Sequence, residues 1–215
     1  MDDYELFPQG SRFPRIPGFP GDAVAGNKSS PPTEGLPSGS ELGDYRILRL
    51  IHEGRTASVY EVRARFDGRR YALKTPRDPA SLQACESLRV ERAFNARLRH
   101  PALLGIQGQG EARGVPYFLM TLQSGETAGD LLPDSSDLLD AGSLIALAAR
   151  FASVVDAVSA LHRSGIVHRD IHPENILLDS EGRLVLADLG SALNLADRNL
   201  HPEIEPAGSI LYRSP

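Results

Sequence analysis

A short polar run between two apolar segments constrains this chain more than any other feature. Residues 168–175 read HRDIHPEN, and Asp188-Leu189-Gly190 follows after a second apolar stretch. Asp170, Asn175 and Asp188 supply two carboxylates and an amide, which suit Mg²⁺ because this ion takes few protein oxygens and keeps phosphate and water as its other ligands. A carboxylate beside such a site can accept a proton from an attacking hydroxyl. The spacing therefore indicates a site for metal-assisted group transfer rather than a structural loop.

The composition is ordinary for a soluble globular domain. Hydrophobic residues make up 41% and charged residues 24%, and the net charge is −5. No block of lysine or arginine suits a phosphate backbone or an anionic membrane, so we expect no nucleic-acid partner. The single cysteine, Cys85, suits a reducing compartment, and the acidic start lacks the pattern of a secretion signal. We therefore expect a cytoplasmic location.

The most apolar long run extends from Ser143 to Leu161. Arg150 and Asp156 interrupt it, and its apolar residues recur with helical spacing. We expect a buried amphipathic helix rather than a membrane span. The apolar stripe predicted to be buried comprises Leu144, Leu147, Phe151, Val154, Val155, Val158 and Leu161.

The N-terminal part differs in composition from the rest. Residues 1–43 are rich in Pro, Gly and Ser and lack a periodic apolar pattern. Such a segment cannot bury enough surface to offset its ordering entropy, so we predict a disordered arm. The alternative is a proline-rich arm that binds a partner. Ordered structure is predicted to begin near Asp44.

From there the pattern is strands with one helix, followed by a long helix and a compact loop-and-hairpin unit, which is an α+β arrangement. A first helix is predicted over Leu82–Leu98, and a small hairpin over 175–178 and 184–187. Five strands are predicted before the long helix: Tyr45–Ile51, Thr56–Arg65, Arg70–Lys74, Leu103–Glu111 and Pro116–Leu122.

With these motifs in this order, residues 45–215 resemble the protein kinase family, specifically the Ser/Thr type widespread in bacteria. The resemblance implies a five-stranded N-lobe with one main helix over 44–122 and an incomplete helical C-lobe over 123–215. It implies ATP as the phosphate donor, Mg²⁺ as the cofactor and a protein as the acceptor. Asp170 would be the catalytic base, and Asn175 and Asp188 would bind Mg²⁺.

A lysine at the end of an apolar strand completes the implied nucleotide site. Lys74 follows Tyr71-Ala72-Leu73, and a cation there can neutralise the α- and β-phosphates if a carboxylate holds it. Glu91, on the predicted first helix, stands where kinases place that carboxylate. By the same resemblance, further nucleotide contacts fall on Ile51, Gly54, Val59, Ala72, Met120, Leu122, Gln123 and Leu177.

Four positions depart from the family pattern. His52 and Ala57 replace two of the three glycines expected in the phosphate loop, so we expect a stiffer loop that grips ATP less well. His172 stands where Ser/Thr kinases usually have lysine, and a histidine is only partly charged near neutral pH. We count His172 among the catalytic residues but expect slower transfer. Asn95 lies where the family prefers an apolar residue, and its amide needs a hydrogen-bond partner.

The last eight residues, 208–215, match the segment that ends a kinase activation loop. Because the family continues with further helices, we expect a truncated domain, or a partner chain or missing segment that covers the incomplete C-lobe.

Three functions remain open. Pro173-Glu174 and Gly208-Ser209 favour Ser/Thr acceptors by resemblance. The altered phosphate loop and His172 would suit a nucleotide-binding pseudokinase that acts as an interaction module. The order Asp-Ile-His-Pro at 170–173 is also similar to small-molecule phosphotransferases, although Arg169 and the 208–215 segment argue against them.

Overall fold

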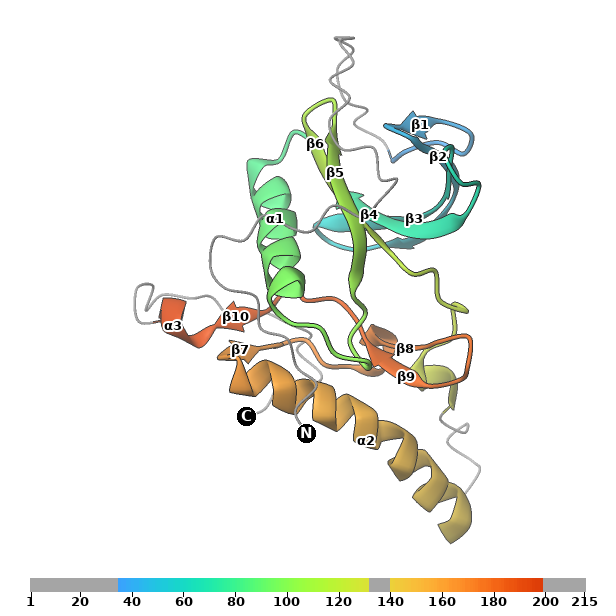
Figure 1. Ribbon diagram of the computed structural model, residues 1–215, viewed down its shortest axis with the longest axis vertical. Helices are drawn as coiled ribbons and strands as arrows, with labels where there is room; N and C mark the ends of the chain where they lie inside the picture. Colours follow the sequence, from blue (N-terminus) through green and yellow to red (C-terminus); the bar gives the residue numbers. More distant parts are fainter. Residues whose placement is uncertain (1–34, 132–139, 199–215) are drawn as a thin grey trace. The chain divides into compact units, whose positions relative to one another are not determined.

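The computed structural model describes residues 35–131 and 140–198, which form two compact units (Figure 1). Among these residues, the first unit holds 35–96 and 105–122, and we call it the sheet unit. The second holds 97–104, 123–131 and 140–198, and we call it the helical unit. Residues 97–104 therefore belong with the second unit, although we predicted them within the N-lobe.

The sheet unit is one antiparallel sheet of six strands in the order β1-β2-β3-β4-β6-β5, with one long helix, α1 (Leu82–Arg97). The five predicted strands are all present, with ends shifted by up to a few residues. The strands are β1 (Glu41–Leu42), β2 (Tyr45–Glu53), β3 (Ala57–Ala64), β4 (Arg70–Pro76), β5 (Ile106–Ala112) and β6 (Val115–Met120).

Alternation along the strands builds the core of this unit. On β3, Tyr60, Val62 and Ala64 are buried, whereas Arg63 between them is exposed. Successive strand residues point to opposite faces, so this pattern turns one face of the sheet toward the core. At the β3–β4 turn, Gly68 adopts a φ of 70°, and the Arg69 amide donates to the Asp67 carboxylate at 2.9 Å. Left-handed backbone of this kind favours glycine and fixes the hairpin register.

The prediction that ordered structure begins at residue 44 is wrong. β1 pairs with β2, and the Leu36 amide donates to the Tyr60 hydroxyl at 3.0 Å. Leu36 and Leu42 pack against the same core as Tyr45. Two leucines among Pro, Gly and Ser give no periodic signal, so the sequence could not reveal this extra edge strand. Residues 1–34 of the predicted arm lie outside the described residues.

The helical unit is built on α2 (Ala141–Arg163). The hairpin β8 (Ile176–Leu178) and β9 (Leu184–Leu186) packs against α2, and β7 (Ile166–Val167) pairs with β10 (Leu193–Asn194). The shorter elements are the 3-10 helices η1 (Ala128–Leu131) and η2 (Pro173–Asn175), and the single turn α3 (Leu195–Arg198).

One side of α2 is only partly covered. Its N-terminus is capped by the Asp140 carboxylate, which accepts from the Ser143 amide at 2.7 Å. Within the predicted stripe, Val154 and Leu161 are buried. Leu144 and Val155 are 52% and 63% exposed, so the prediction of a fully buried stripe is wrong for them. Two small residues outside the predicted stripe, Ala157 and Ala160, are buried as well.

By length and composition, α2 is also the one helix of the described part that could cross a membrane. In the structure its polar side chains serve packing contacts: Arg150 bonds to the Gly182 carbonyl, and Asp156 lies 3.2 Å from His100. These contacts support the interpretation of α2 as a helix packed within a folded unit.

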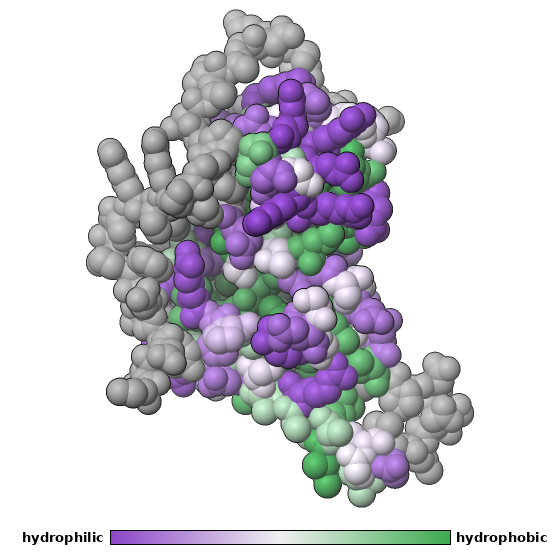
Figure 2. All heavy atoms as spheres, turned by 45° about the vertical axis from the view of Figure 1, so that its right-hand side comes forward, coloured by the Kyte–Doolittle hydropathy of each residue, from purple (hydrophilic) through white to green (hydrophobic). Residues whose placement is uncertain are grey.

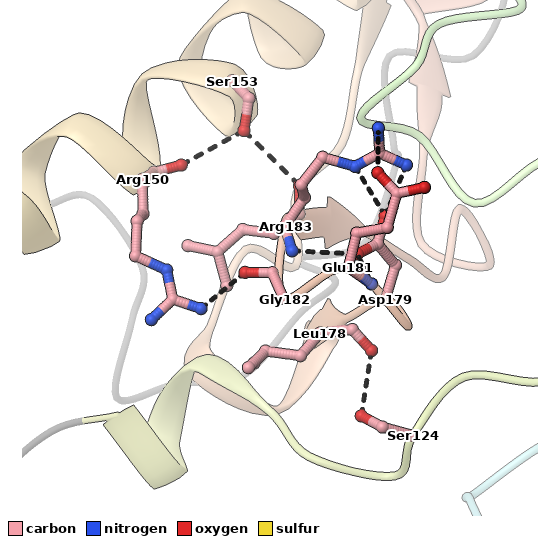
Figure 3. A network of polar contacts seen from close by, with 9 residues as sticks. Ser124, Arg150, Ser153, Leu178, Asp179, Glu181, Gly182 and Arg183 are labelled. Carbon is pink, nitrogen blue, oxygen red and sulfur yellow. Dashed lines mark hydrogen bonds and ion pairs between the residues drawn. The ribbon is translucent and has the colours of Figure 1, made fainter.

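Polar contacts tie the β8–β9 hairpin to its surroundings (Figure 3). Arg150 Nη2 donates to the Gly182 carbonyl at 2.6 Å, and the Ser153 hydroxyl lies 3.4 Å from the Leu184 carbonyl. The Ser124 hydroxyl donates to the Leu178 carbonyl at 3.1 Å. The hairpin that separates Asn175 from Asp188 is therefore fixed at both of its strands and at its turn.

Removing the Arg150 contact should weaken this attachment. Arg150→Ala is expected to lower the free energy of unfolding by about 1–2 kcal/mol, since a charge-assisted hydrogen bond is lost. Amides of β8 and β9 should exchange faster in hydrogen-exchange measurements. Arg183→Ala is the matched control, because Arg183 is exposed and, among the described residues, its ion pairs are with Asp179 and Glu181 in the same hairpin turn. Equal exchange rates in the two variants would contradict this role of Arg150.

Candidate active site

The sheet unit holds a buried ion pair. Lys74 Nζ on β4 lies 2.8 Å from Glu91 Oε1 on α1, and their side chains are only 8% and 4% exposed. The pair joins the helix to the sheet at a buried point. The partner expected for Lys74 is therefore the one observed. The role of the pair toward phosphate stays a prediction.

Asn95 lies one turn after Glu91 on α1. Its Nδ2 donates to the backbone carbonyl of Glu91 at 3.1 Å. The amide thus finds its partner within its own helix, a local bond open to short polar side chains. The expected need of this residue for a hydrogen-bond partner is met without a contact from outside α1.

Three of the predicted nucleotide residues share one face of the sheet. Val59 on β3 lies directly opposite Lys74, and Ala72 lies two residues before Lys74 on β4. Met120 on β6 lies opposite Ala72, and both are buried, with 8% and 7% of their surfaces exposed. A small apolar surface therefore adjoins the lysine, as an adenine-binding face requires.

The predicted phosphate loop is a tight turn between β2 and β3. The Gly54 amide donates to the Ala57 carbonyl at 2.9 Å, and a Cβ at Gly54 would lie 3.1 Å from that oxygen. This close approach explains the glycine at 54, whereas Ala57 fits as the first residue of β3. Ile51, near the end of β2, is 37% exposed.

The helical unit carries the loop of residues 168–175. Asn175 Nδ2 donates to the Asp170 carbonyl at 2.9 Å and lies 3.5 Å from Asp170 Oδ2. The backbone of Asn175 bonds to His172 on one side and to Ala187 on the other. The loop is therefore closed on itself and joined to the residue just before Asp188. Asp170 is 22% exposed at its side chain, so its carboxylate remains accessible.

Two residues of this region adopt left-handed backbone. Arg169 has φ 66° and Asp188 has φ 64°. Arg169 Nε donates to the Ser191 carbonyl at 2.7 Å, and the exposed Asp188 accepts from the Gly190 amide at 2.9 Å. Such backbone is costly for residues other than glycine and persists where surrounding contacts determine it, often at functional sites.

His172 lies beside the expected base. Its Nε2 is 3.8 Å from Asp170 Oδ1, and its Nδ1 is 4.0 Å from Glu174 Oε2. Both distances exceed a hydrogen bond, so the contact is electrostatic and present only when the imidazole is protonated. The side chain is 14% exposed, which leaves it near the loop surface.

The remaining predicted residues lie in different units. Leu122 is a half-buried residue after β6 in the sheet unit, whereas Gln123 belongs to the helical unit. Leu177 is half-buried on β8, where it forms a bridge with Thr127. The candidate residues thus form two groups, one around Lys74 and one around Asp170.

The donor chemistry fits Mg²⁺. The Asn175 amide nitrogen donates to Asp170, which leaves the amide oxygen of Asn175 as a donor for a metal, and the Asp188 carboxylate is a second oxygen donor. In the part of the chain that the structure describes, no three His, Cys, Asp or Glu side chains cluster as a ready-made metal site. An ion held here would therefore rely on phosphate and water for its other ligands, which is the coordination that Mg²⁺ prefers.

His168 is a site residue to which the sequence analysis assigned no role. It is 1% exposed; Nδ1 accepts from the Asp170 amide at 3.3 Å, and Nε2 lies 3.1 Å from the Ala187 carbonyl. Because Nδ1 accepts, Nε2 carries the proton and donates. The ring therefore connects the backbone amide of Asp170 with the carbonyl of Ala187, the residue before Asp188. The only sequence signal for the burial of His168 was the apolar stretch that directly precedes it.

Burial lowers the pKa of His168 below its ordinary value of 6.5. The unfolded chain therefore binds a proton that the folded chain does not, and stability is lost as pH falls below about 6.5. His168→Gln keeps a donor and an acceptor but does not titrate, so its melting temperature should fall less between about pH 7.5 and 5.5. His162→Gln, at an exposed position of α2, is the control. If His168→Gln and the control lose the same stability on acidification, the buried-histidine explanation is wrong.

The fold and the two residue groups define a protein-kinase-like structure, and comparison with known proteins agrees. Residues 45–215 match the protein kinase domain family. The chain therefore belongs to the protein kinase family, and the predicted α+β kinase-like fold is confirmed.

Its relatives include kinases from plants and bacteria. The chain is 38% identical to CBL-interacting protein kinase 4 of Oryza sativa subsp. japonica over 70% of its length. It is 30% identical to the probable serine/threonine-protein kinase PknB of Lactococcus lactis over 80% of its length. It covers 34% and 27% of these two relatives, so it spans about a third of their length or less.

Solved structures give the same fold. The PknI kinase domain of Mycobacterium tuberculosis matches with a TM-score of 0.56 and 28% identity, over 73% of this chain and 63% of that one. A double mutant of the same domain matches with a TM-score of 0.58 and 27% identity, over 73% of this chain and 64% of that one.

Proposed function

We propose that this chain transfers the γ-phosphate of ATP to serine or threonine hydroxyls of proteins. The observation that carries the proposal is the buried Lys74–Glu91 pair. Burying two charges is costly, and a pair of packed apolar residues could replace them with little loss of stability. A phosphate-binding role accounts for a buried lysine held by a carboxylate better than a structural role does.

The proposed roles follow from the contacts in each unit. Lys74, oriented by Glu91, pairs with the α- and β-phosphates, and the face formed by Val59, Ala72 and Met120 receives the adenine. Asp170 accepts the proton of the acceptor hydroxyl while that oxygen bonds to the γ-phosphorus and the bond to the β–γ bridging oxygen breaks, which releases ADP.

Asn175 and Asp188 would hold Mg²⁺ in this proposal. When bound, the ion neutralises negative charge on the β- and γ-phosphates. His172, when protonated, would add positive charge near Asp170, to a smaller extent than a lysine would. We therefore propose slower transfer than a lysine at position 172 would give.

A nucleotide-binding pseudokinase is the second candidate. The observation that favours it is the tight turn at Gly54 to Ala57, in which the second and third residues are Arg55 and Thr56 rather than glycine. A turn without further glycines approaches phosphates less closely.

Two readouts on the same sample distinguish the candidates. Mg²⁺ and ATP should raise the melting temperature of the native chain, and ADP should accumulate in the presence of a basic protein acceptor. Nucleotide-dependent stabilisation with no ADP formed would favour the pseudokinase. Absence of both stabilisation and turnover would contradict both candidates.

We also propose a cytoplasmic location and further polypeptide that covers the exposed side of α2. The free, buried Cys85 is consistent with a reducing compartment. The exposed Leu144, Ile145 and Val155 on α2 support the proposal that further polypeptide packs on this helix, because apolar surface of this kind usually marks a contact.

A further inference from the structure

The sheet face that carries Val59, Ala72 and Lys74 also carries a row of three arginines farther along β2, β3 and β4. The strand register places Arg46 opposite Arg63, and Arg63 opposite Arg70. Residues directly opposite on antiparallel strands share a face, with Cβ atoms about 4.5–5.5 Å apart. All three are exposed, and Figure 2 shows hydrophilic side chains gathered over the part of the molecule where β2 and β3 lie. We call these three residues the arginine row.

One member of the row already binds a carboxylate of the chain. Glu61, whose side chain is 5% exposed, lies 3.0 Å from Arg70 Nη1 and 2.7 Å from Arg49 Nε. Glu41 lies directly opposite Arg46 on β1, but its carboxylate pairs with Arg65. Among the described residues, neither Arg46 nor Arg63 forms an ion pair. The contact of Arg70 with Glu61 therefore shows that a guanidinium group on this face can bind a carboxylate. The guanidinium groups of Arg46 and Arg63 remain available for another acid.

The surrounding charges do not cancel the row. Arg65 pairs with Glu41 at 3.2 Å, and both side chains are more than half exposed. Five arginines on this face stand against Glu41 and Glu61, so three positive charges are uncompensated. Like charges directly opposite on neighbouring strands destabilise a sheet. The free surface thus carries an electrostatic cost that a bound acid would relieve.

A short acidic protein segment fits this surface better than a nucleic acid does. The chain as a whole has a net charge of −5, so a long polyanion would be repelled by most of the molecule. A few carboxylates can contact the row alone, and the planar guanidinium pairs with a carboxylate through two parallel hydrogen bonds.

We propose that the arginine row is a docking surface for an acidic segment of a partner protein, whose Asp or Glu side chains pair with Arg46 and Arg63. The row lies wholly within the sheet unit, and docking there does not depend on phosphoryl transfer. The proposal therefore stands or fails separately from the kinase activity.

The test uses a fluorescent decamer of glutamate, with a glutamine decamer as the uncharged probe. Native chain should bind the glutamate decamer in low salt, and Arg46→Gln with Arg63→Gln should weaken binding about tenfold, because two exposed ion pairs are lost. Arg89→Gln with Arg92→Gln on α1 removes the same charge elsewhere and should change binding less than about twofold.

The free protein gives a second readout. Arg63→Gln alone should raise the melting temperature without any probe, because Arg63 stands between two like charges. Unchanged decamer binding in the Arg46/Arg63 variant would overturn the proposal, as would equal binding of the glutamine decamer. An oligonucleotide of equal charge that displaces the glutamate decamer at equimolar concentration would overturn the assignment of a protein partner.

Discussion

Replacing Lys74 by alanine lowers the free energy of unfolding by about 3–5 kcal/mol, because the carboxylate of Glu91 is left buried and uncompensated. A loss of this size is a large part of the roughly 5–15 kcal/mol by which domains are stable. Stabilisation by Mg²⁺ and ATP should disappear in the same variant, since the cation proposed to hold the α- and β-phosphates is gone. Urea unfolding with and without nucleotide measures both effects.

A double variant separates the two effects. Lys74→Met together with Glu91→Leu removes both charges and keeps apolar volume, so stability should return to within about 1–2 kcal/mol of the native chain. Nucleotide should still give no stabilisation. A double variant as unstable as Lys74→Ala would show that the uncompensated carboxylate is not the cause. Restored nucleotide binding would contradict the phosphate role of Lys74.

Replacing Asp170 by asparagine reduces phosphate transfer by about 10²–10⁴-fold, because the amide cannot take the proton of the acceptor hydroxyl. Asparagine has nearly the same shape and can still accept from Asn175 through its backbone carbonyl. The free energy of unfolding should therefore change by less than about 1 kcal/mol, and nucleotide binding should persist. Initial rates of phosphate incorporation at saturating ATP measure the effect.

Glu174→Gln is the matched control for Asp170. It removes a carboxylate from the same loop at a side chain that is 82% exposed, so the rate should stay within about threefold of the native rate. If Asp170→Asn keeps more than a tenth of the native rate, Asp170 is not the base. Equal losses in both variants would point to the charge of the loop as a whole.

Much of the fold could be predicted from local patterns. Alternation located the strands from Tyr45 to Met120, and helical spacing located α1 and α2, because each element buries one face. β1 was missed because pairing of a two-residue strand depends on tertiary contacts of Leu42 and on the bond from Leu36 to Tyr60. The local pattern also could not predict which side of α2 is covered, because this depends on where β7 and β9 pack against the helix.

The chemical groups of the site were visible as motifs, whereas their supporting contacts were not. Resemblance to the kinase pattern indicated Lys74 with Glu91, and the spacing of the motif indicated Asp170 with Asn175. His168 connects two loops through backbone groups, and Asn95 bonds within its own helix; neither contact has a sequence pattern. The arginine row could not be predicted from the sequence, because a net charge of −5 does not indicate which side chains the strand register places opposite one another.

The central claim is transfer of phosphate to serine or threonine, and one measurement tests it most directly. Native protein is incubated with Mg²⁺, ATP labelled at the γ-phosphate and a basic protein acceptor, and the labelled amino acids are identified after hydrolysis. We predict labelled phosphoserine or phosphothreonine, lost in Asp170→Asn. Label on tyrosine, label that persists in Asp170→Asn, or no labelled amino acid at all would contradict the account.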